Sequence, residues 1–135
     1  MHLPTEVQPK VLGQKTLKEI GSCIEDASVG ILVADEHLRI QFLNQLARPQ
    51  FSSIPDPRGQ SWPDILRRHW TEDAANEVIT VITKTLASGA PYSSIDFSAD
   101  RLDLQHEQRF HWEAHRVATS EGRQILVCYF VGPVA

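Results

Sequence analysis

The first regular pattern in the chain is a stripe of apolar residues at helical spacing. Leu17, Ile20 and Ile24 recur three or four positions apart, and lysines and glutamates occupy positions between them. This spacing places the apolar side chains on one face of an amphipathic helix, which we predict over residues 12–27. The stripe fits either packing on the chain's own domain or contact with a second copy. Residues 1–11 carry two prolines and no periodicity, so we expect a flexible lead-in there.

Two short apolar runs follow and predict a β-hairpin. Residues 30–34 and 38–43 are rich in β-branched and other apolar side chains, and they flank the polar turn Asp35-Glu36-His37. A helical turn is expected after Asn44. We expect Pro49 to interrupt it, because proline lacks the N–H that a continuing helix needs.

Two helices are predicted in the middle of the chain, after a proline-rich loop at residues 52–59. The shorter helix begins at Ser61, which is a candidate N-cap. The longer helix begins at Thr71 and carries two acidic residues in its first turn, where the helix dipole favours them. The Ser88-Gly89 pair is typical of a helix end.

Beyond Pro91 the apolar period changes to two, which predicts strands at residues 92–98, 109–118 and 123–131. In the last strand both alternating sets are apolar, so both faces must be covered. The fold class predicted is α+β. It comprises a five-stranded antiparallel sheet with the short helices and the longer helix on one face, and the N-terminal amphipathic helix able to cover the other.

Composition narrows the class of protein. The 135 residues are enough for one domain with a core that needs no disulfide or metal. A net charge of -4 argues against a nucleic-acid partner. No apolar run approaches the roughly 18 residues of a membrane span, and the start of the chain lacks a signal peptide. We therefore expect a cytoplasmic protein, in which Cys23 and Cys128 are buried apolar thiols.

Several stretches in order resemble the PAS domain family, the small sensory module of bacterial kinases, cyclases and regulators. They are Ala27–Asp35, Leu38–Asn44, Ser88–Tyr92, and Trp112–Val117 leading to Glu121–Arg123. The resemblance covers about residues 24–131. With the patterns above, it divides the chain into a flexible segment (1–11), a helix (12–27), a PAS-like domain (28–131) and a tail (132–135). That tail stands where relatives continue into a signalling helix, so we expect an effector beyond this segment or a free-standing module.

The resemblance implies a sensory or regulatory role. Such a module binds a small ligand, or relays a conformational change through homodimerisation, to an effector such as a histidine kinase of a two-component system. The alternative is a ligand-free interaction or dimerisation domain. The expected dimer contacts lie on the N-terminal helix and the last strand, and they are Leu17, Ile20, Ile24, Ile125, Val127 and Tyr129.

Members of this family hold their ligand between the sheet and the short helices. The residues that this implies are Phe42, Asn44, Trp62, Ile65, His69, Trp112 and Tyr129. A dry apolar cavity of about 300 Å³ would cost about 7 kcal/mol, comparable to the whole stability of a small domain. The space is therefore either occupied by a ligand or filled by the protein's own side chains. Asn44 has a second interpretation, in which its side chain satisfies backbone groups at the end of the second strand.

Chemistry within the chain is not predicted. No nucleophile elbow, phosphate-binding glycine loop or kinase signature is present, so we expect no enzyme activity. A cluster of His106, His111 and His115 with two glutamates suggests a metal site. However, positions i and i+4 of a strand stand roughly 13 Å apart, too far for one zinc ion, which favours a plain polar face.

Cofactors are not identified by the sequence. Flavin-binding light sensors of this family form an adduct with a cysteine in the short-helix region, and residues 59–73 contain none. Haem-binding relatives often use a histidine on the long helix, where this chain offers only His69 just before it. A surface or capping role for His69 is favoured over haem ligation.

Overall fold

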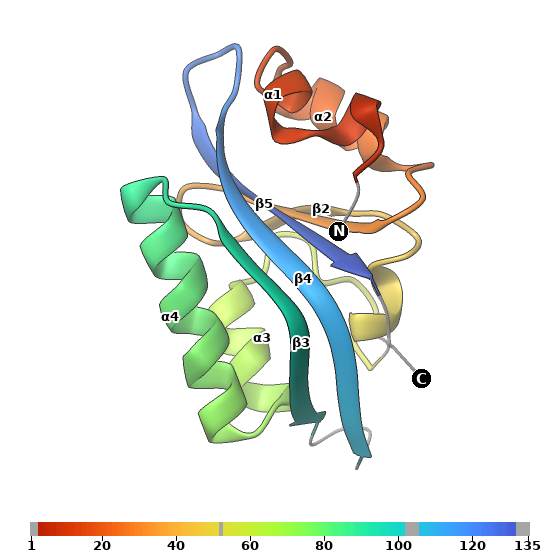
Figure 1. Ribbon diagram of the computed structural model, residues 1–135, viewed down its shortest axis with the longest axis vertical. Coiled ribbons are helices and arrows are strands. Elements are labelled where there is room, and N and C mark those ends of the chain that lie inside the picture. Colours follow the sequence, from red (N-terminus) through yellow and green to blue (C-terminus); the bar gives the residue numbers. More distant parts are fainter. Residues whose placement is uncertain (1–2, 52, 102–105, 132–135) are drawn as a thin grey trace.

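The sheet is five-stranded and antiparallel, as predicted. The computed structural model describes residues 3–51, 53–101 and 106–131, the side chains of residues 95–110 excepted. The strands are β1 (Gly30–Ala34), β2 (Ile40–Leu43), β3 (Tyr92–Arg101), β4 (His106–Ala118) and β5 (Gln124–Val131). They lie in the order β2-β1-β5-β4-β3, so the last strand in the chain occupies the middle of the sheet (Figure 1).

Within the described residues the helical segments are η1 (Thr5–Val7), α1 (Pro9–Leu12), α2 (Leu17–Ile24), η2 (Arg48–Phe51), α3 (Trp62–His69) and α4 (Glu72–Ser88). Side-chain caps begin α2 and α3, whereas α4 starts after Thr71 without a side-chain cap bond. Ser61 caps α3, since its Oγ accepts a 3.3 Å hydrogen bond from the backbone N–H of Asp64. Gly89 ends α4 with a φ of 79°, which glycine adopts without strain. None of the helices in the described ranges has both the length and the apolar character to cross a bilayer.

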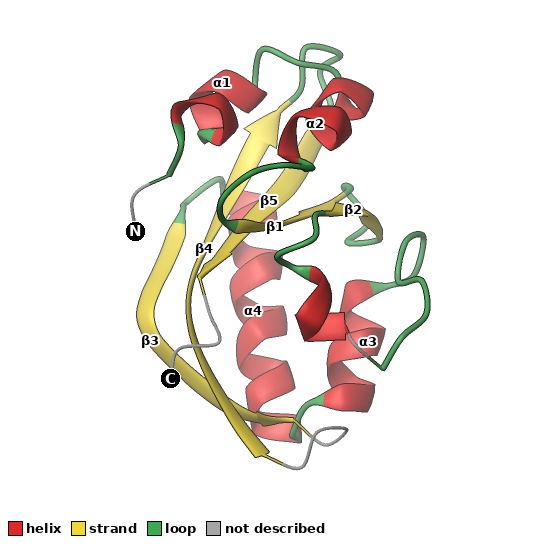
Figure 2. Cartoon of the chain, turned by 90° about the vertical axis from the view of Figure 1, so that its right-hand side faces the viewer, coloured by secondary structure: helices red, strands yellow, loops and turns green. Residues whose placement is uncertain are grey.

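The middle strand β5 is buried on both faces, as its doubly apolar sequence predicts. Side chains of successive residues point to opposite faces, so Cys128 and Phe130 meet α3 and α4 while Val127 and Tyr129 meet the N-terminal helices. Figure 2 shows these two groups of helices at separate places around the sheet. The sheet therefore separates two cores.

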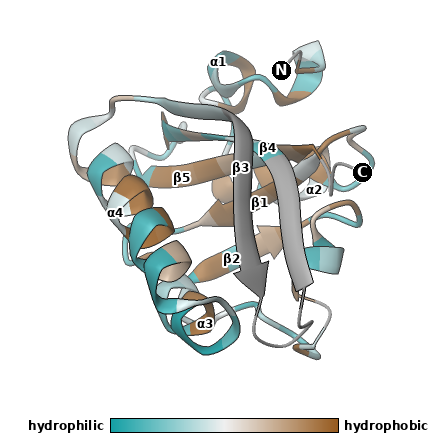
Figure 3. Ribbon diagram, turned by 60° about the horizontal axis from the view of Figure 1, so that its bottom comes forward, coloured by the Kyte–Doolittle hydropathy of each residue, from teal (hydrophilic) through white to brown (hydrophobic). Residues whose placement is uncertain are grey.

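The core between the sheet and η2, α3 and α4 is here named the helix-side core. Its buried members are Leu32, Ala34, Ile40, Leu43, Ala47, Phe51, Trp62, Ile65, Leu66, Trp70, Ala74, Ala75, Val78, Ile82, Trp112, Ala114, Leu126, Cys128 and Phe130. Figure 3 shows α4 with hydrophilic residues turned outward and hydrophobic ones toward this core.

The core between the sheet and the N-terminal helices is here named the N-terminal core. Its buried members are Leu3, Val7, Leu12, Leu17, Ile20, Ile24, Val29, Ile31, Val33, Val117, Ile125, Val127 and Tyr129. All six residues expected at a dimer contact are among them. Of the two interpretations of the helical stripe, the structure shows packing on the chain's own domain.

The N-terminal helix predicted over residues 12–27 is two helices, which corrects the expectation. α1 ends at Leu12, and α2 starts after a new N-cap at Thr16. Thr16 Oγ1 accepts from the backbone N–H of Glu19 at 3.1 Å, and Glu19 Oε1 accepts from the backbone N–H of Thr16 at 2.9 Å. This capping box begins a helix. The apolar stripe continues across the break, so its period alone predicted one helix.

The lead-in expected to be flexible is folded from residue 3 onward. It contains η1 and α1, and Leu3 and Val7 are buried in the N-terminal core. Pro9 does not oppose this structure, because it lies in the first turn of α1, where no intrahelical N–H is required. The prediction was based on the two prolines and on the lack of an apolar period. It did not take account of Leu3 and Val7, which are isolated apolar residues in the sequence but pack against the sheet.

The segment after β2 also differs from expectation. Pro49 does not end a helical turn but is the second residue of η2, a position that needs no N–H donor. The turn before it is built on the carbonyl of Asn44, which accepts from the backbone N–H groups of Ala47 and Arg48. As a result, η2 carries Phe51 into the helix-side core.

Candidate functional site

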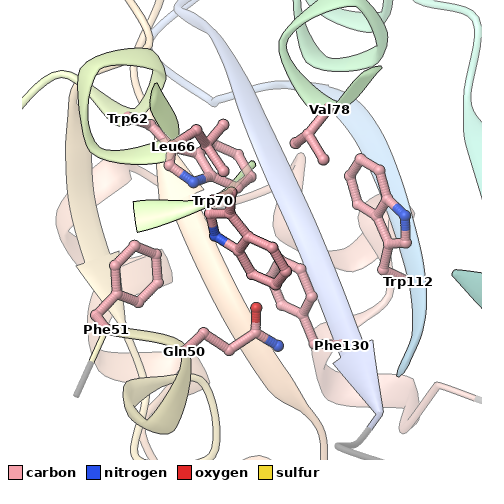
Figure 4. A pocket seen from close by; sticks show the side chains of 8 residues that line it. All are labelled: Gln50, Phe51, Trp62, Leu66, Trp70, Val78, Trp112 and Phe130. Carbon is pink, nitrogen blue, oxygen red and sulfur yellow. The ribbon is translucent and has the colours of Figure 1, made fainter. Parts of the chain in front are cut away.

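A small cavity remains inside the helix-side core, and Figure 4 shows the side chains around it. It is lined by Gln50, Phe51, Trp62, Leu66, Trp70, Val78, Trp112 and Phe130. Its volume is about 20 Å³, which is room for about one water molecule. The lining is aromatic and aliphatic apart from one amide, and no residue in it carries a charge. Such a surface suits an apolar group and not an ion.

All three tryptophans of the chain line this cavity, which we name the inner cavity. Trp62 begins α3, Trp70 follows the last residue of α3, and Trp112 lies on β4. The ring of Trp112 is stacked with that of Phe130 on β5, with 6.2 Å between centroids and 6° between planes. Helices and sheet thus meet at the inner cavity through large flat side chains.

A second hollow borders the inner cavity at Phe51, the one residue that both linings share. This outer hollow has a volume of about 160 Å³ and opens to the surface. Its lining consists of Leu43, Arg48, Phe51, Ile54, Pro55 and Pro57. Arg48 is the only charged residue in that lining.

Asn44 is fully buried, lines neither cavity, and has its side chain fully engaged with the backbone. Its Oδ1 accepts from the N–H of Ile31 at 2.9 Å and of Ala47 at 3.2 Å. Its Nδ2 donates to the carbonyls of Ile24 at 2.9 Å and of Val29 at 2.8 Å. These four bonds use the amide's two donors and both lone pairs of its oxygen. This geometry supports the structural interpretation of Asn44, in which its side chain satisfies backbone groups at the end of β2.

Comparison with known proteins identifies the fold. Neither a protein-family model nor a curated protein matches the chain. The PAS domain of BvgS from Bordetella pertussis matches it with a TM-score of 0.67 at 14% identity, over 88% of this chain and 87% of that one. The RpfR PAS domain of Cronobacter turicensis in complex with C12:0 matches with a TM-score of 0.55 at 17% identity, over 80% and 96%. The VqmA dimer of Vibrio cholerae matches with a TM-score of 0.62 at 16% identity, over 86% and 52%.

The chain has the PAS fold. The predicted fold class and the resemblance to PAS domains are therefore confirmed. At these low identities the likeness concerns the fold alone, so the site must be argued from this chain's own residues.

The ligand residues expected for a PAS domain divide between the two faces of the sheet. Trp62 and Trp112 line the inner cavity, and Ile65 lies in the same core without lining it. Phe42 and Tyr129 lie on the opposite face, against the N-terminal core. Strand alternation predicts which residues share a face, but it does not say which face meets the helices. These two residues cannot line this cavity.

Tyr129 ties the N-terminal segment to the PAS sheet. Its hydroxyl donates a 2.6 Å hydrogen bond to the carbonyl of Val7. Burial raises the pKa of the Tyr129 phenol far above its ordinary value, so it stays protonated at physiological pH. The ring of His115 stands edge-on against it at 5.7 Å between centroids.

His69, the expected haem candidate, ends α3 and does not line the inner cavity. It is half-buried, and its Nδ1 lies 3.5 Å from Ser53 Oγ.

His111, Glu113 and His115 of the candidate histidine cluster alternate along β4 and so share one face of the strand. Glu113 Oε1 lies 3.1 Å from His115 Nε2, and both side chains are largely buried. The side chains of His106 and Glu107 lie outside the described residues. Where side chains are described, no three metal-binding residues converge. Of the Glu113–His115 pair, His115 lies edge-on against the ring of Tyr129, which is fully buried.

The two cysteines have different surroundings. Cys128 is fully buried in the helix-side core, and burial raises the pKa of its thiol well above the usual value. Cys23 is only half-buried and its Sγ donates to the carbonyl of Glu6 at 3.2 Å. The expectation of buried thiols is thus right for Cys128 and wrong for Cys23, which faces the covering segment η1 at the rim of α2.

Sequence reasoning missed six of the eight residues around the inner cavity, namely Gln50, Phe51, Leu66, Trp70, Val78 and Phe130. A signal for three lining residues was present, because Trp62, Leu66 and Trp70 follow one another at intervals of four along one helical face. Gln50 and Phe51 carried no such signal. They depend on η2, which the interpretation of Pro49 had excluded.

Proposed function

We propose that this chain is a sensory PAS module whose input is a small molecule bound at the inner cavity. The observation that carries the proposal is the placement of all three tryptophans around one cavity between the sheet and the helices. The role is regulatory and non-catalytic. Occupancy of the site acts by favouring one of two arrangements of the module, since a ligand that binds both equally signals nothing.

One known PAS structure supports a small-molecule input. The RpfR domain is solved in complex with C12:0, and VqmA forms a dimer and has a target DNA. For this chain we propose the first kind of input, a small ligand. A homodimer and an effector such as a histidine kinase remain parts of the proposal, as does a cytoplasmic location.

The route of the signal runs through β5. Phe130 lines the inner cavity, and its neighbour Tyr129 points to the other face, where it holds the carbonyl of Val7. A shift of β5 that follows a ligand would therefore reach the N-terminal helices through a single peptide unit. The six residues first expected at a dimer contact fill the N-terminal core, so we propose that the dimer contacts lie on other surfaces.

The alternative is a ligand-free interaction domain, and one observation favours it. The inner cavity of about 20 Å³ admits no organic molecule unless a side chain moves. The two functions therefore predict different behaviour of the cavity lining. In a sensor, the side chain of Phe51 or of a neighbouring residue moves when the ligand binds, and in a ligand-free domain it does not.

Native mass spectrometry and a small-molecule thermal-shift screen separate these functions. A sensor retains extra mass after purification, or gains thermal stability with some compound. Leu66→Phe, which fills the inner cavity, should abolish that response, whereas Thr80→Ala on the exposed face of α4 should keep it. If the wild type carries no mass and responds to no compound, and Leu66→Phe behaves like it, the ligand-free domain is correct.

A further inference from the structure

The two hollows that meet at Phe51 differ in charge, and this difference restricts the ligand. The inner cavity has no charged residue in its lining, while the outer hollow has one, Arg48. A charged ligand group cannot enter the inner cavity without losing its hydration. It could remain at the surface, where only a negative group would be attracted.

The guanidinium of Arg48 is available to such a group. Among the described residues, no carboxylate forms an ion pair with it. Asp56 is close enough to feel the charge of Arg48, but its carboxylate accepts two side-chain bonds from Arg58, at 3.1 Å each. Those bonds, with a smaller contribution from Arg48, lower the pKa of the Asp56 carboxyl. Asp56 is thus held by Arg58 while Arg48 faces the hollow.

The remaining walls of the outer hollow favour a flat apolar body. They come from Leu43, Ile54 and two prolines, and the shared wall is the ring of Phe51. A volume of about 160 Å³ is close to that of a cavity that holds a benzene-sized molecule, about 150 Å³. If Phe51 turns aside, the body can extend toward the tryptophans of the inner cavity.

We propose that the ligand class of this module is a small aromatic carboxylic acid. Its ring lies against Phe51 and extends toward Trp62 and Trp70, and its carboxylate pairs with Arg48. This inference rests on the proposed sensory function and adds the chemistry of the ligand to it.

Three probes of equal shape test the charge preference. They are phenylacetate, 2-phenylethanol and 2-phenylethylamine, titrated into the full chain at neutral pH. Because every tryptophan lines the inner cavity, intrinsic tryptophan fluorescence reports on this site, and calorimetry gives the affinity. We expect phenylacetate to bind about tenfold more tightly than the alcohol, and the amine to bind most weakly.

Two variants locate the effect. Arg48→Gln should reduce the affinity for phenylacetate to that for the alcohol. The control is Arg68→Gln, at an exposed arginine of α3 that neither lines the hollow nor bonds Asp56, and it should leave the preference intact. Leu66→Phe should lower the affinity for all three probes, because the larger side chain fills the inner cavity. Circular dichroism and thermal unfolding confirm that each variant is folded.

The outcomes separate the ligand class from the proposed function. Equal affinities for acid and alcohol, a preference for the amine, or an acid preference that survives Arg48→Gln would each overturn the inference. If none of the probes binds while another compound stabilises the wild type and not Leu66→Phe, the inference falls and the sensory function stands. If nothing binds and no mass is retained, both fail.

Discussion

The two cores on either side of the sheet are built from the same strands but are packed differently. The helix-side core keeps a cavity of about 20 Å³ among its tryptophans. In the N-terminal core, α2 approaches β2 so closely that a Cβ atom at Gly21 would lie 2.6 Å from the ring of Phe42. Large aromatic rings on separate elements leave gaps where they meet, whereas the aliphatic stripe of α2 fits closely onto the strands. The helix-side core is therefore suited to binding a ligand, and the N-terminal core is suited to holding the N-terminal helices firmly on the sheet.

The largest effect is expected where the N-terminal helices join the sheet. Asn44→Ala removes four buried hydrogen bonds, including the bond that the side chain accepts from the backbone N–H of Ile31 in β1. We expect the free energy of unfolding to fall by about 3 kcal/mol or more, measured by urea denaturation. Gln45→Ala, at the exposed neighbouring position, is the control. A loss below about 1 kcal/mol would show that the network is not what joins the two parts.

The close approach of α2 is tested by Gly21→Ala. The added methyl group collides with the ring of Phe42, so either the ring or α2 must move. We expect a loss of about 2 kcal/mol in unfolding free energy, despite the better helix propensity of alanine. Ser22→Ala, on the exposed side of the same helix, should be neutral or slightly stabilising. A stabilised Gly21→Ala variant would contradict the tight packing of this core.

A matched pair of enlargements compares the two cores directly. Val127→Ile adds one methylene to the N-terminal core and should cost about 1–2 kcal/mol by overpacking. Val78→Ile adds the same group beside the inner cavity and should change the unfolding free energy by less than about 0.5 kcal/mol. Thermal and urea denaturation measure both. Equal losses in the two variants would mean that the cores do not differ in free space.

A modest effect is expected for Tyr129→Phe, which removes one hydroxyl and keeps the ring. The lost bond to Val7 should lower the unfolding free energy by about 1 kcal/mol at neutral pH. Hydrogen exchange should rise at the backbone of η1 and α1, with little change in α4. Uniformly faster exchange would argue against a local tie between β5 and the N-terminal segment.

The same variant carries a pH signature. Burial raises the pKa of Tyr129 above the value near 10 of an unfolded chain, so its contribution to stability is present below about pH 10 and is lost as pH rises further. The alkaline loss of unfolding free energy should therefore be shallower in Tyr129→Phe than in the wild type. Cys128, whose pKa burial also raises, is present in both proteins and cancels in the comparison.

The fold was largely predictable because its main signals are local. The period of two in β5, the capping residue Ser61 and the stop at Gly89 each act within a few residues. The failures came where distant groups decide the outcome. The segment from residue 3 to α1 is ordered by contacts with the sheet. Pro49 fits into η2 because it is in the first turn, where no backbone N–H donor is needed.

The candidate site was less predictable than the fold. Trp62 and Trp112 were foreseen at the site, but Phe42 and Tyr129 were assigned to the wrong face, and Phe51 and Trp70 were not foreseen. Residues of one strand can be sorted into two faces from sequence alone. Which face carries the aromatic cavity depends on the side on which α3 and α4 pack.

By itself, the sequence determined the five strands, α3 and α4, the doubly covered middle strand and the α+β class, since hydrophobic period and capping are properties of neighbouring residues. Only the tertiary structure decided that three tryptophans from α3, its C-terminal end and β4 converge on one cavity, and that Arg48 stands at its outer side. It also decided that the apolar stripe of α2 covers its own sheet. These outcomes depend on strand order and on which helices pack on which face, and the packing of segments far apart in the chain sets both.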